Sequence, residues 1–209
     1  IITGQSTTGK TKAVTLLLEN PDIEVINCDR FSFYKNSSAG RDVKPLVERD
    51  EVSQRAHFYS ILEPDENTWN PSHYLQEVER LVPEIASRGH TPLIEGFSGG
   101  YLRALLDANK QGGKSITYAP LFYICYQRGA NLVALFEKRV EKFISEGALE
   151  EARYLHERYP NCFNVEQSSI YKPLIRYLQG EITLEQAKGD IVDDSLLVLA
   201  VQAQFVEQN

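Results

Sequence analysis

A glycine-rich loop near the start of the chain carries the residue types that a phosphate-binding site needs. Residues 4–11 read GQSTTGKT, which fits the pattern G-x-x-x-x-G-K-[ST], between an apolar run and a run of helical character. Gly4 and Gly9 allow successive backbone N–H groups to converge on one anion, and the following helix adds its positive end. Lys10 supplies a mobile charge for the outer phosphate, and the hydroxyl of Thr11 suits Mg2+. We therefore expect a phosphate loop with Mg2+ at Thr11; the alternative is a glycine-rich turn that binds nothing.

A carboxylate follows the second predicted strand. Residues 23–27 read IEVIN, an apolar run typical of a buried strand, and the chain continues through Cys28 to Asp29. In open α/β sheets the carboxyl ends of parallel strands border the binding crevice, so we expect Asp29 beside the phosphate loop. There it could accept a proton as a general base or hold Mg2+ through water, and the residues alone leave both roles open.

Strand-like and helix-like segments alternate through the first part of the chain. The predicted strands cover residues 1–3, 23–27, 57–62, 91–95 and 117–126. A helix is expected to begin at Asn70-Pro71, and Pro83 should kink it or shorten it. This alternation predicts an α/β fold in which helices flank a parallel sheet, as in P-loop NTPases.

The remainder of the chain is predicted to be helical. The expected helices cover residues 131–146, 148–158 and 168–179, a short one opened by a capping box at residues 183–186, and 193–208. The polar, glycine-containing segment 109–115 is the clearest seam between elements. We expect a P-loop α/β core over residues 1–126 and a helical part over residues 127–209, packed together as one compact unit.

Composition limits the classes of partner. The 209 residues include 22 basic and 29 acidic ones, for a net charge of −7, which argues against a broad nucleic-acid surface. No apolar run approaches the roughly 18 residues of a membrane span, and no signal peptide is evident, so no membrane partner is expected. The 3 cysteines have unrelated spacings, which favours a reducing, cytoplasmic location. Because the chain lacks methionine and begins inside an expected strand, we expect its start to be trimmed.

Several segments, taken in order, resemble the adenine isopentenyltransferase family. That family comprises tRNA dimethylallyltransferases and shorter enzymes that prenylate free adenine nucleotides to make cytokinins. The segments that carry the resemblance are the phosphate loop, NCDRFSFYK at 27–35, Lys44-Pro45, PLIEGFSGGYLRALL at 92–106, FEKRV at 136–140, EGALEEAR at 146–153 and YKPLIRYLQGEIT at 171–183. No one segment after the phosphate loop is specific, but their ordered combination covers most of the chain.

The resemblance implies a prenyl transfer. The phosphate loop would hold the diphosphate of dimethylallyl diphosphate, the exocyclic N6 of adenine would attack the prenyl carbon C1, and diphosphate would leave with Mg2+. Asp29 matches the aspartate that accepts or orients the N6 proton, Ser6 a hydroxyl that bonds a diphosphate oxygen, and Arg139 an arginine that holds the diphosphate. The implied catalytic residues are Asp29, Lys10 and Ser6, and the implied binding residues are Gly4, Gly9, Lys10, Thr11 and Arg139, with Ser38, Arg41 and Lys44 as further candidates.

Two departures from the tRNA-modifying branch favour a free nucleotide, AMP, ADP or ATP, as the acceptor. Those enzymes carry a helical insertion after the strand–Gly–Gly segment, whereas here Leu106 leads through a short linker to Thr117. Their C-terminal helix is basic, whereas here it is acidic and then apolar from Asp193 onward. We therefore predict an adenylate dimethylallyltransferase of cytokinin biosynthesis, with a tRNA dimethylallyltransferase as the alternative.

Two further readings, in which the chain is not a prenyltransferase, also remain open. A P-loop small-molecule or nucleotide kinase would bind ATP in the loop and close arginines over it, and only Arg128 is a candidate for such a lid. A non-enzymatic relative would bind a ligand or partner without turnover. The altered C-terminal helix is the only feature that favours this last reading.

Overall fold

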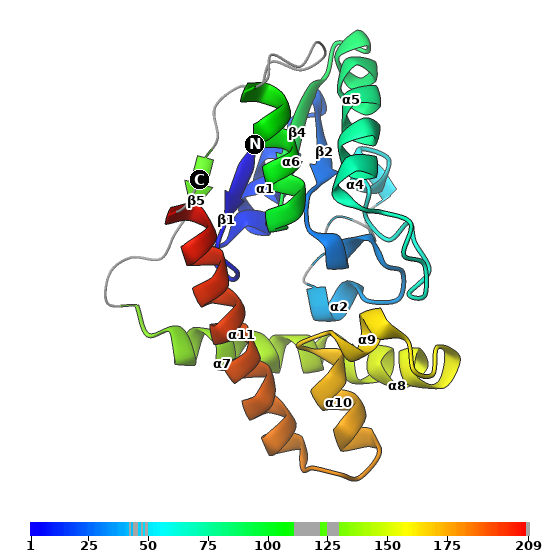
Figure 1. Ribbon diagram of the computed structural model, residues 1–209, viewed down its shortest axis with the longest axis vertical. Coiled ribbons are helices and arrows are strands. Elements are labelled where there is room, and N and C mark those ends of the chain that lie inside the picture. The colour runs from blue at the N-terminus through cyan, green and yellow to red at the C-terminus, as the bar shows by residue number, and fades with distance from the viewer. Residues whose placement is uncertain are drawn as a thin grey trace.

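Five parallel strands form the sheet at the centre of the fold. The computed structural model describes residues 1–41, 43, 46, 48, 50–110, 122–124 and 130–207 (Figure 1). The strands are β1 (Ile2–Gly4), β2 (Ile23–Asn27), β3 (Ala56–His57), β4 (Thr91–Glu95) and β5 (Phe122–Ile124), in the spatial order β3-β2-β4-β1-β5. All pairings are parallel. The predicted α/β fold with a P-loop-like parallel sheet is therefore confirmed.

Three of the helices flank the sheet: α1 (Lys10–Leu17), α5 (Pro71–Ser87) and α6 (Gly99–Lys110). The side chain of Asn70 accepts a hydrogen bond from the His73 N–H at 2.9 Å and so caps α5, as predicted. Pro83 does not end this helix, which continues to Ser87. Apolar residues before and after Pro83, including Leu81 and Ile85, are buried in the core, and their packing holds the last turn in place.

The predicted strand over residues 57–62 is mostly wrong. β3 ends at His57, and both Phe58 (φ 67°) and Ser60 (φ 52°) have left-handed backbone conformations. The backbone pairs instead with the 3-10 helix η1 (Arg30–Phe33), since the Ser60 N–H donates to the Ser32 carbonyl at 2.9 Å. Phe58 packs among the rings of Phe33, Trp69 and Tyr74. The apolar run indicates that these residues are buried, here in an aromatic core. A turn can be buried in this way as well as a strand, so the run alone does not distinguish the two.

The helical part contains α7 (Leu132–Ser145), α8 (Ala148–Arg158), α9 (Phe163–Glu166), α10 (Tyr171–Leu178) and α11 (Leu184–Glu207). Thr183 and Gln186 form the predicted capping box, with reciprocal bonds of 2.8 and 3.2 Å. The prediction of two separate helices after it is wrong, because α11 is one helix of 24 residues. Ala187, Ile191 and Val192 are buried in the helical core on either side of Gly189, and this packing keeps the helix continuous.

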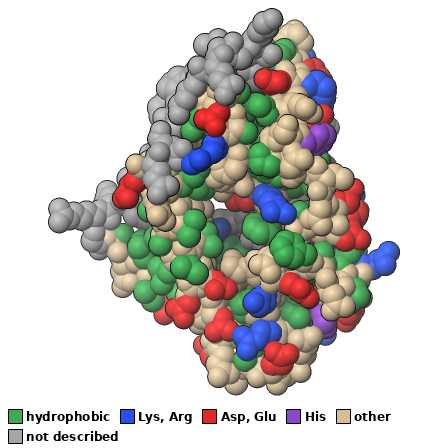
Figure 2. Space-filling view, in the orientation of Figure 1, with side chains coloured by type: hydrophobic (Ala, Val, Ile, Leu, Met, Phe, Trp, Pro, Cys, Tyr) green, Lys and Arg blue, Asp and Glu red, His purple; other side chains and the backbone are tan. Residues whose placement is uncertain are grey.

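Helix α11 connects the helical part to the sheet. It packs against α7 and α10 over its first part and runs to the neighbourhood of β1 and α6 (Figure 1). Apolar side chains gather on its outer face (Figure 2), and Leu197 and Val201 are 66% and 61% exposed. The predicted boundary between residues 126 and 127 and most of the seam at 109–115 lie outside the described residues. Among those described, no helix is long and apolar enough to cross a membrane.

The short helices α2 (Ser38–Arg41) and α4 (Asp50–Ser53) are among the described residues of the segment between η1 and β3. Three hydrogen bonds to the carboxylate of Glu151 on α8 hold α2 against the helical part: from the Ser38 hydroxyl at 3.3 Å, the Ala39 N–H at 2.9 Å and the Gly40 N–H at 3.2 Å. The segment between η1 and β3 thus contains helical turns, and the first of them is bonded to α8.

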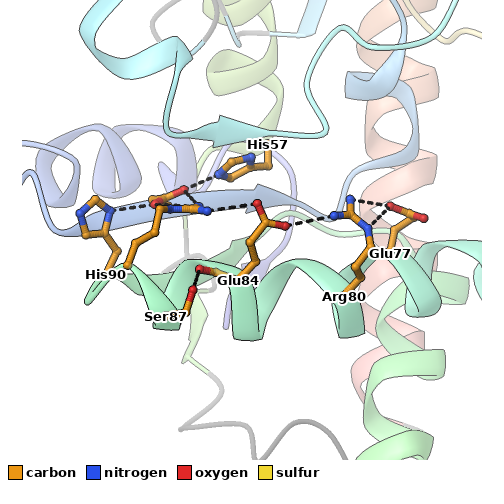
Figure 3. A network of polar contacts seen from close by, with 8 residues as sticks. His57, Glu77, Arg80, Glu84, Ser87 and His90 are labelled. Carbon is orange, nitrogen blue, oxygen red and sulfur yellow. Dashed lines mark hydrogen bonds and ion pairs between the residues drawn. The ribbon is translucent and has the colours of Figure 1, made fainter.

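A buried carboxylate at the amino end of β2 ties three elements together (Figure 3). Glu24 is 3% exposed. It accepts hydrogen bonds from His57 of β3 at 2.6 Å, Arg88 at 2.8 Å and His90 at 2.7 Å, the last two just after α5. Burial by itself would raise the pKa of Glu24, but the bonds from Arg88, His57 and His90 outweigh it and hold the pKa at about 2. Because this network lies at the opposite end of β2 from Asp29, we infer that its role is to stabilise the fold.

Replacing Glu24 by glutamine is therefore expected to destabilise the protein by about 3 kcal/mol at neutral pH. The folded-state pKa lies below the unfolded one, so this contribution is complete above about pH 4.5 and is lost as the pH falls toward about 2. Urea unfolding of both proteins over this range measures the difference. Glu84→Gln is the control, since Glu84 pairs with Arg80 and Arg88 with its side chain 50% exposed and should contribute about 1 kcal/mol or less. Equal effects of the two substitutions would contradict the assignment.

Candidate active site

The carboxyl ends of β1, β2 and β4 meet at one edge of the sheet, and the predicted site residues lie there. β4 lies between β1 and β2, so the segment after Glu95 separates the phosphate loop from Asp29. A cavity of about 710 Å³ opens over this edge. Its lining includes Ser6, Gly9, Lys10, Thr11, Asp29, Glu95, Gly96 and Arg139. The structure thus brings together residues that lie as much as 133 positions apart in the chain.

The phosphate loop has the backbone that the glycines were expected to allow. Gly4 (φ 144°) ends β1 and Gly9 (φ 90°) precedes α1, both in conformations that favour glycine. Thr7 also has a left-handed backbone conformation, with φ 62°. Such a curl, followed at once by a helix, presents backbone N–H groups and the positive end of α1 to the cavity.

Lys10 is the first residue of α1 and lies among charged groups. Its ammonium donates to the Gln5 carbonyl at 2.8 Å, a contact within the loop. Burial lowers the pKa of Lys10, the charges of Glu95 and Asp29 oppose that change, and Arg139 adds to it. Two carboxylates and two cations therefore face one another across the cavity.

Asp29 is held rigidly by its neighbours on β2 and η1. Its N–H donates to Asn27 Oδ1 at 2.8 Å, while Asn27 Nδ2 donates to the Asp29 carbonyl at 2.9 Å and to the Phe58 carbonyl at 3.0 Å. Asp29 Oδ1 accepts the Phe31 N–H at 3.1 Å and caps η1. Within the described residues nothing else bonds to this carboxylate, so Oδ2 is available to a substrate in the cavity.

Glu95 is a second carboxylate that the sequence reasoning missed as a site residue. It ends β4, is 5% exposed, and accepts a hydrogen bond from the Tyr59 hydroxyl at 2.9 Å. Burial raises the pKa of Glu95, although Lys10 and the bond from Tyr59 oppose the change. The sequence contains one signal for this residue: a charged side chain ends an otherwise apolar predicted strand, at the carboxyl edge of the predicted sheet.

Gly96 allows the ends of β2 and β4 to approach closely. It has φ 131°, and a Cβ at this position would lie 2.7 Å from both the Asp29 nitrogen and the Cys28 carbonyl carbon. The Cys28 N–H donates to the Glu95 carbonyl at 2.6 Å, and the Thr3 hydroxyl donates to the Gly96 carbonyl at 2.7 Å. Gly96 is therefore needed to bring Asp29 beside the phosphate loop.

Gly96→Ala is expected to destabilise the protein by about 2–4 kcal/mol and to lower catalytic activity, because the new methyl group displaces Asp29. Gly89→Ala is the matched control. It has the same kind of backbone strain (φ 81°), but nothing lies within 4 Å of a Cβ there. It should cost about 1 kcal/mol and leave activity intact. Thermal unfolding and turnover of both variants test the expectation, and equal loss of activity would refute it.

Helix α7 supplies cations to the opposite wall of the cavity. Arg139, Lys138 and Lys142 all line it, and the Arg139 guanidinium lies 4.8 Å from the centre of the Phe143 ring. The last turns of α7 thus add positive charge to that of Lys10 and Lys12. A diphosphate is a chemical group that such a wall can bind.

A second cavity of about 550 Å³ adjoins the first and shares four of its residues, Ser6, Asp29, Ser32 and Arg139. Its other walls come from η1, the segment after β4, the residues just before α10, and α11. Their apolar residues are Phe31, Phe97, Ile170, Leu197, Val198, Val201 and Phe205. The face drawn in Figure 2 is hollowed beside the apolar surface of α11. Asp29 therefore stands where a cationic cavity and an apolar, aromatic cavity meet.

Not every predicted binding residue reaches this site. Ser38 lines a separate cavity with Glu151 and Glu48, because its hydroxyl bonds to those carboxylates. The side chain of Arg41 and all of Lys44 lie outside the described residues. Gly4 shapes the loop without lining the cavity. Within the described part of the chain, no cluster of three metal-binding side chains is present.

Comparisons with known proteins agree with this geometry. The model of the IPP transferase family matches residues 33–115 and 108–207. The tRNA dimethylallyltransferase of Streptococcus equi subsp. equi is 24% identical over 247 residues, covering 91% of this chain and 82% of the relative. The tRNA dimethylallyltransferase of Koribacter versatilis is 33% identical over 107 residues, covering 51% of this chain and 34% of the relative.

Two solved structures share the fold. The tRNA isopentenylpyrophosphate transferase of Staphylococcus epidermidis has a TM-score of 0.79 at 19% identity, covering 98% of this chain and 88% of the other. Its counterpart from Bacillus halodurans has a TM-score of 0.78 at 21% identity, covering 100% and 86%. The family match extends over most of the chain, from η1 to the end of α11. This protein therefore belongs to the IPP transferase family of prenyltransferases.

Proposed function

We propose that this protein transfers a dimethylallyl group from dimethylallyl diphosphate to the N6 amine of an adenine in tRNA. The observation that carries the proposal is the meeting of two unlike cavities at Asp29. The cationic cavity suits a diphosphate, and the aromatic one suits a base that stacks on side chains such as Phe31 and Phe97. The bond-forming atoms of the two substrates would then lie at the junction.

The residues at the junction suit a direct displacement. The N6 nitrogen forms a bond to prenyl C1, the bond from C1 to oxygen breaks, and its electron pair leaves with the diphosphate. Asp29 accepts the proton that N6 loses, a contribution of about 10²–10⁴-fold. Lys10, Arg139 and the N–H groups of the phosphate loop stabilise the charge on the leaving diphosphate, which is generally the larger contribution.

Mg2+ fits this site as a metal shared with the substrate. The donors of the phosphate-loop wall are the Thr11 hydroxyl and the carboxylate of Asp29, with no cage of three protein ligands in the described chain. Mg2+ usually binds through one or two protein oxygens and completes its shell with water and substrate phosphates. Thr11 would hold the ion, which would neutralise charge on the diphosphate.

The choice of tRNA over a free nucleotide reverses the preference drawn from the sequence. The relatives that span most of this chain are named tRNA dimethylallyltransferases. The acidic net charge of −7 is an average over the chain, whereas Lys138, Arg139 and Lys142 gather on one wall of the site. A negative net charge is therefore compatible with local cationic surfaces that contact phosphate groups.

A free adenine nucleotide is the second candidate acceptor. The alignment with the Streptococcus equi relative spans 247 positions but uses 91% of these 209 residues, so that relative carries several dozen residues without a counterpart here. The two segments matched by the family model overlap at residues 108–115. In this region the sequence passes from Leu106 to Thr117 without the helical insertion that the resemblance implies for tRNA-modifying members. A site with less surface for RNA favours a smaller acceptor.

A competition experiment tests the proposal. The protein is incubated with dimethylallyl diphosphate, Mg2+, AMP and an unmodified tRNA that has an accessible adenosine, and both products are examined by mass spectrometry. We expect a dimethylallyl group on the tRNA adenine, with release of diphosphate. Modification of AMP alone would select the second candidate. Absence of prenyl transfer to either acceptor, while dimethylallyl diphosphate remains intact, would overturn the proposal.

A further inference from the structure

A buried amide links the last helix to the phosphate loop. Oε1 of Gln202 on α11 accepts two hydrogen bonds from Ser6, one from its backbone N–H at 2.9 Å and one from its hydroxyl at 3.4 Å. Gln202 is 8% exposed, although its neighbour Val201 is 61% exposed. The two bonded residues are 196 positions apart in the chain. This glutamine is thus the polar contact by which α11 reaches the substrate-binding loop.

Aromatic packing one turn further along α11 fixes the position of Gln202. The Phe205 ring lies 5.5 Å from that of Phe97, and the Arg103 guanidinium lies 5.6 Å from the Phe205 ring centre. A Cβ at Gly99 would approach Phe205 to 3.2 Å, so the helix and the start of α6 are in close contact. The amide therefore reaches the loop from a helix that is anchored independently of it.

The chemistry of the bond identifies which end of the amide faces the loop. A backbone N–H can only donate, so the atom that it meets must be the carbonyl oxygen of Gln202. The Ser6 N–H and the Ser6 hydroxyl both donate to this oxygen, and Ser6 lines both cavities at their junction. A neutral acceptor suits this place because a carboxylate would repel a diphosphate in the adjoining loop.

We propose that Gln202 is a positioning residue for the diphosphate. By bonding both polar groups of Ser6, it fixes the course of the loop, so that the N–H groups that follow Ser6 face the donor. The inference rests on the proposed function, since it assumes that the loop binds a diphosphate. It also gives the C-terminal helix a part in donor binding, alongside its contribution to the apolar acceptor cavity.

Binding of inorganic diphosphate in the presence of Mg2+, measured by calorimetry, tests the proposal without turnover. Gln202→Met keeps the length of the side chain but removes the acceptor, and it should weaken binding about tenfold. Gln202→Glu keeps an acceptor but adds a charge, so it should weaken binding more at about pH 8. Burial at this position and the neighbouring diphosphate should raise the pKa of the new carboxyl group above that of a free glutamic acid. It should therefore take up a proton as the pH is lowered toward about 5, and its affinity relative to wild type should then recover.

The same two substitutions at Gln204 are the matched controls, because Gln204 lies exposed on the same helix. They should change diphosphate affinity by less than about twofold. Thermal unfolding of all four variants separates loss of fold from loss of positioning, since a purely structural role of Gln202 gives no pH-dependent recovery in Gln202→Glu. If the wild type binds diphosphate and the Gln202 variants match their Gln204 counterparts, this inference fails and the proposed function stands. If the wild type does not bind diphosphate, both fail.

Discussion

Lys10→Ala should lower kcat/KM for dimethylallyl diphosphate by about 10³-fold, through both a higher KM and a lower kcat. The ammonium lies at the start of α1 with its charge facing Asp29 and Glu95, and in the complex it would bond a diphosphate oxygen. A charge-assisted bond to the diphosphate strengthens as the leaving group gains charge, so the substitution affects binding and the chemical step together. Steady-state kinetics with varied donor and saturating acceptor measure both changes.

Lys12→Ala is the matched control for this effect. Lys12 lines the same cavity from the same helix but is exposed to solvent, so its contribution should be several-fold at most and should diminish with added salt. Similar losses in the two variants would mean that the cavity attracts the donor by its general charge rather than through a specific contact of Lys10. Unchanged donor kinetics in Lys10→Ala would mean that the loop serves another ligand, such as ATP in a kinase.

The local parts of the site could be predicted from the sequence because short segments determine them. The phosphate loop needs only eight consecutive residues, since its curl and the start of α1 follow from the two glycines and the helical run. Asp29 could be placed because it follows a buried strand, and parallel strands present their carboxyl ends on one edge. Both inferences use rules that act within one element or one sheet.

The contacts made between distant segments could not be predicted in this way. Glu95 and Gly96 acquire their importance from the close approach of β4 to β2, which no local pattern records. Gln202 follows an apolar run on α11 and looks no different in sequence from the exposed Gln204. Its bond to Ser6 exists only because Phe205 anchors that helix on the start of α6. The sequence predicts a strand at Phe58, where the structure has a turn. The apolar run there reflects burial in an aromatic cluster formed with distant residues, not strand pairing.

In the helical part, too, local signals could be predicted from the sequence and long-range packing could not. Capping signals predicted where α11 begins, because Thr183 and Gln186 bond to each other's backbone. They did not predict that the helix continues to Glu207, since that depends on Ile191 and Val192 packing in the helical core. This continuity has a consequence for function, because a break in α11 would detach Gln202 and the apolar wall from the site.

Asp29→Asn is expected to reduce kcat by about 10²–10⁴-fold while KM for the donor stays within about threefold. Asparagine retains an oxygen that can accept the Phe31 N–H, so η1 and the loop around it should keep their geometry. What it loses is the ability to take a proton from the N6 amine as the new bond forms. Single-turnover measurements with saturating donor and acceptor isolate this chemical step from product release.

Two controls separate the catalytic role of Asp29 from the other roles that a carboxylate can have. Asp22→Asn makes the same change at the other end of β2, where the residue is exposed, and should leave kcat within about twofold. Titration with Mg2+ tests the metal role: if activity of Asp29→Asn returns to the wild-type value at high Mg2+, Asp29 holds the metal and is not the base. Near-normal turnover at ordinary Mg2+ would exclude both roles. A loss of kcat that Mg2+ does not restore, with donor affinity preserved, is the result that a general base at the junction of the two cavities requires.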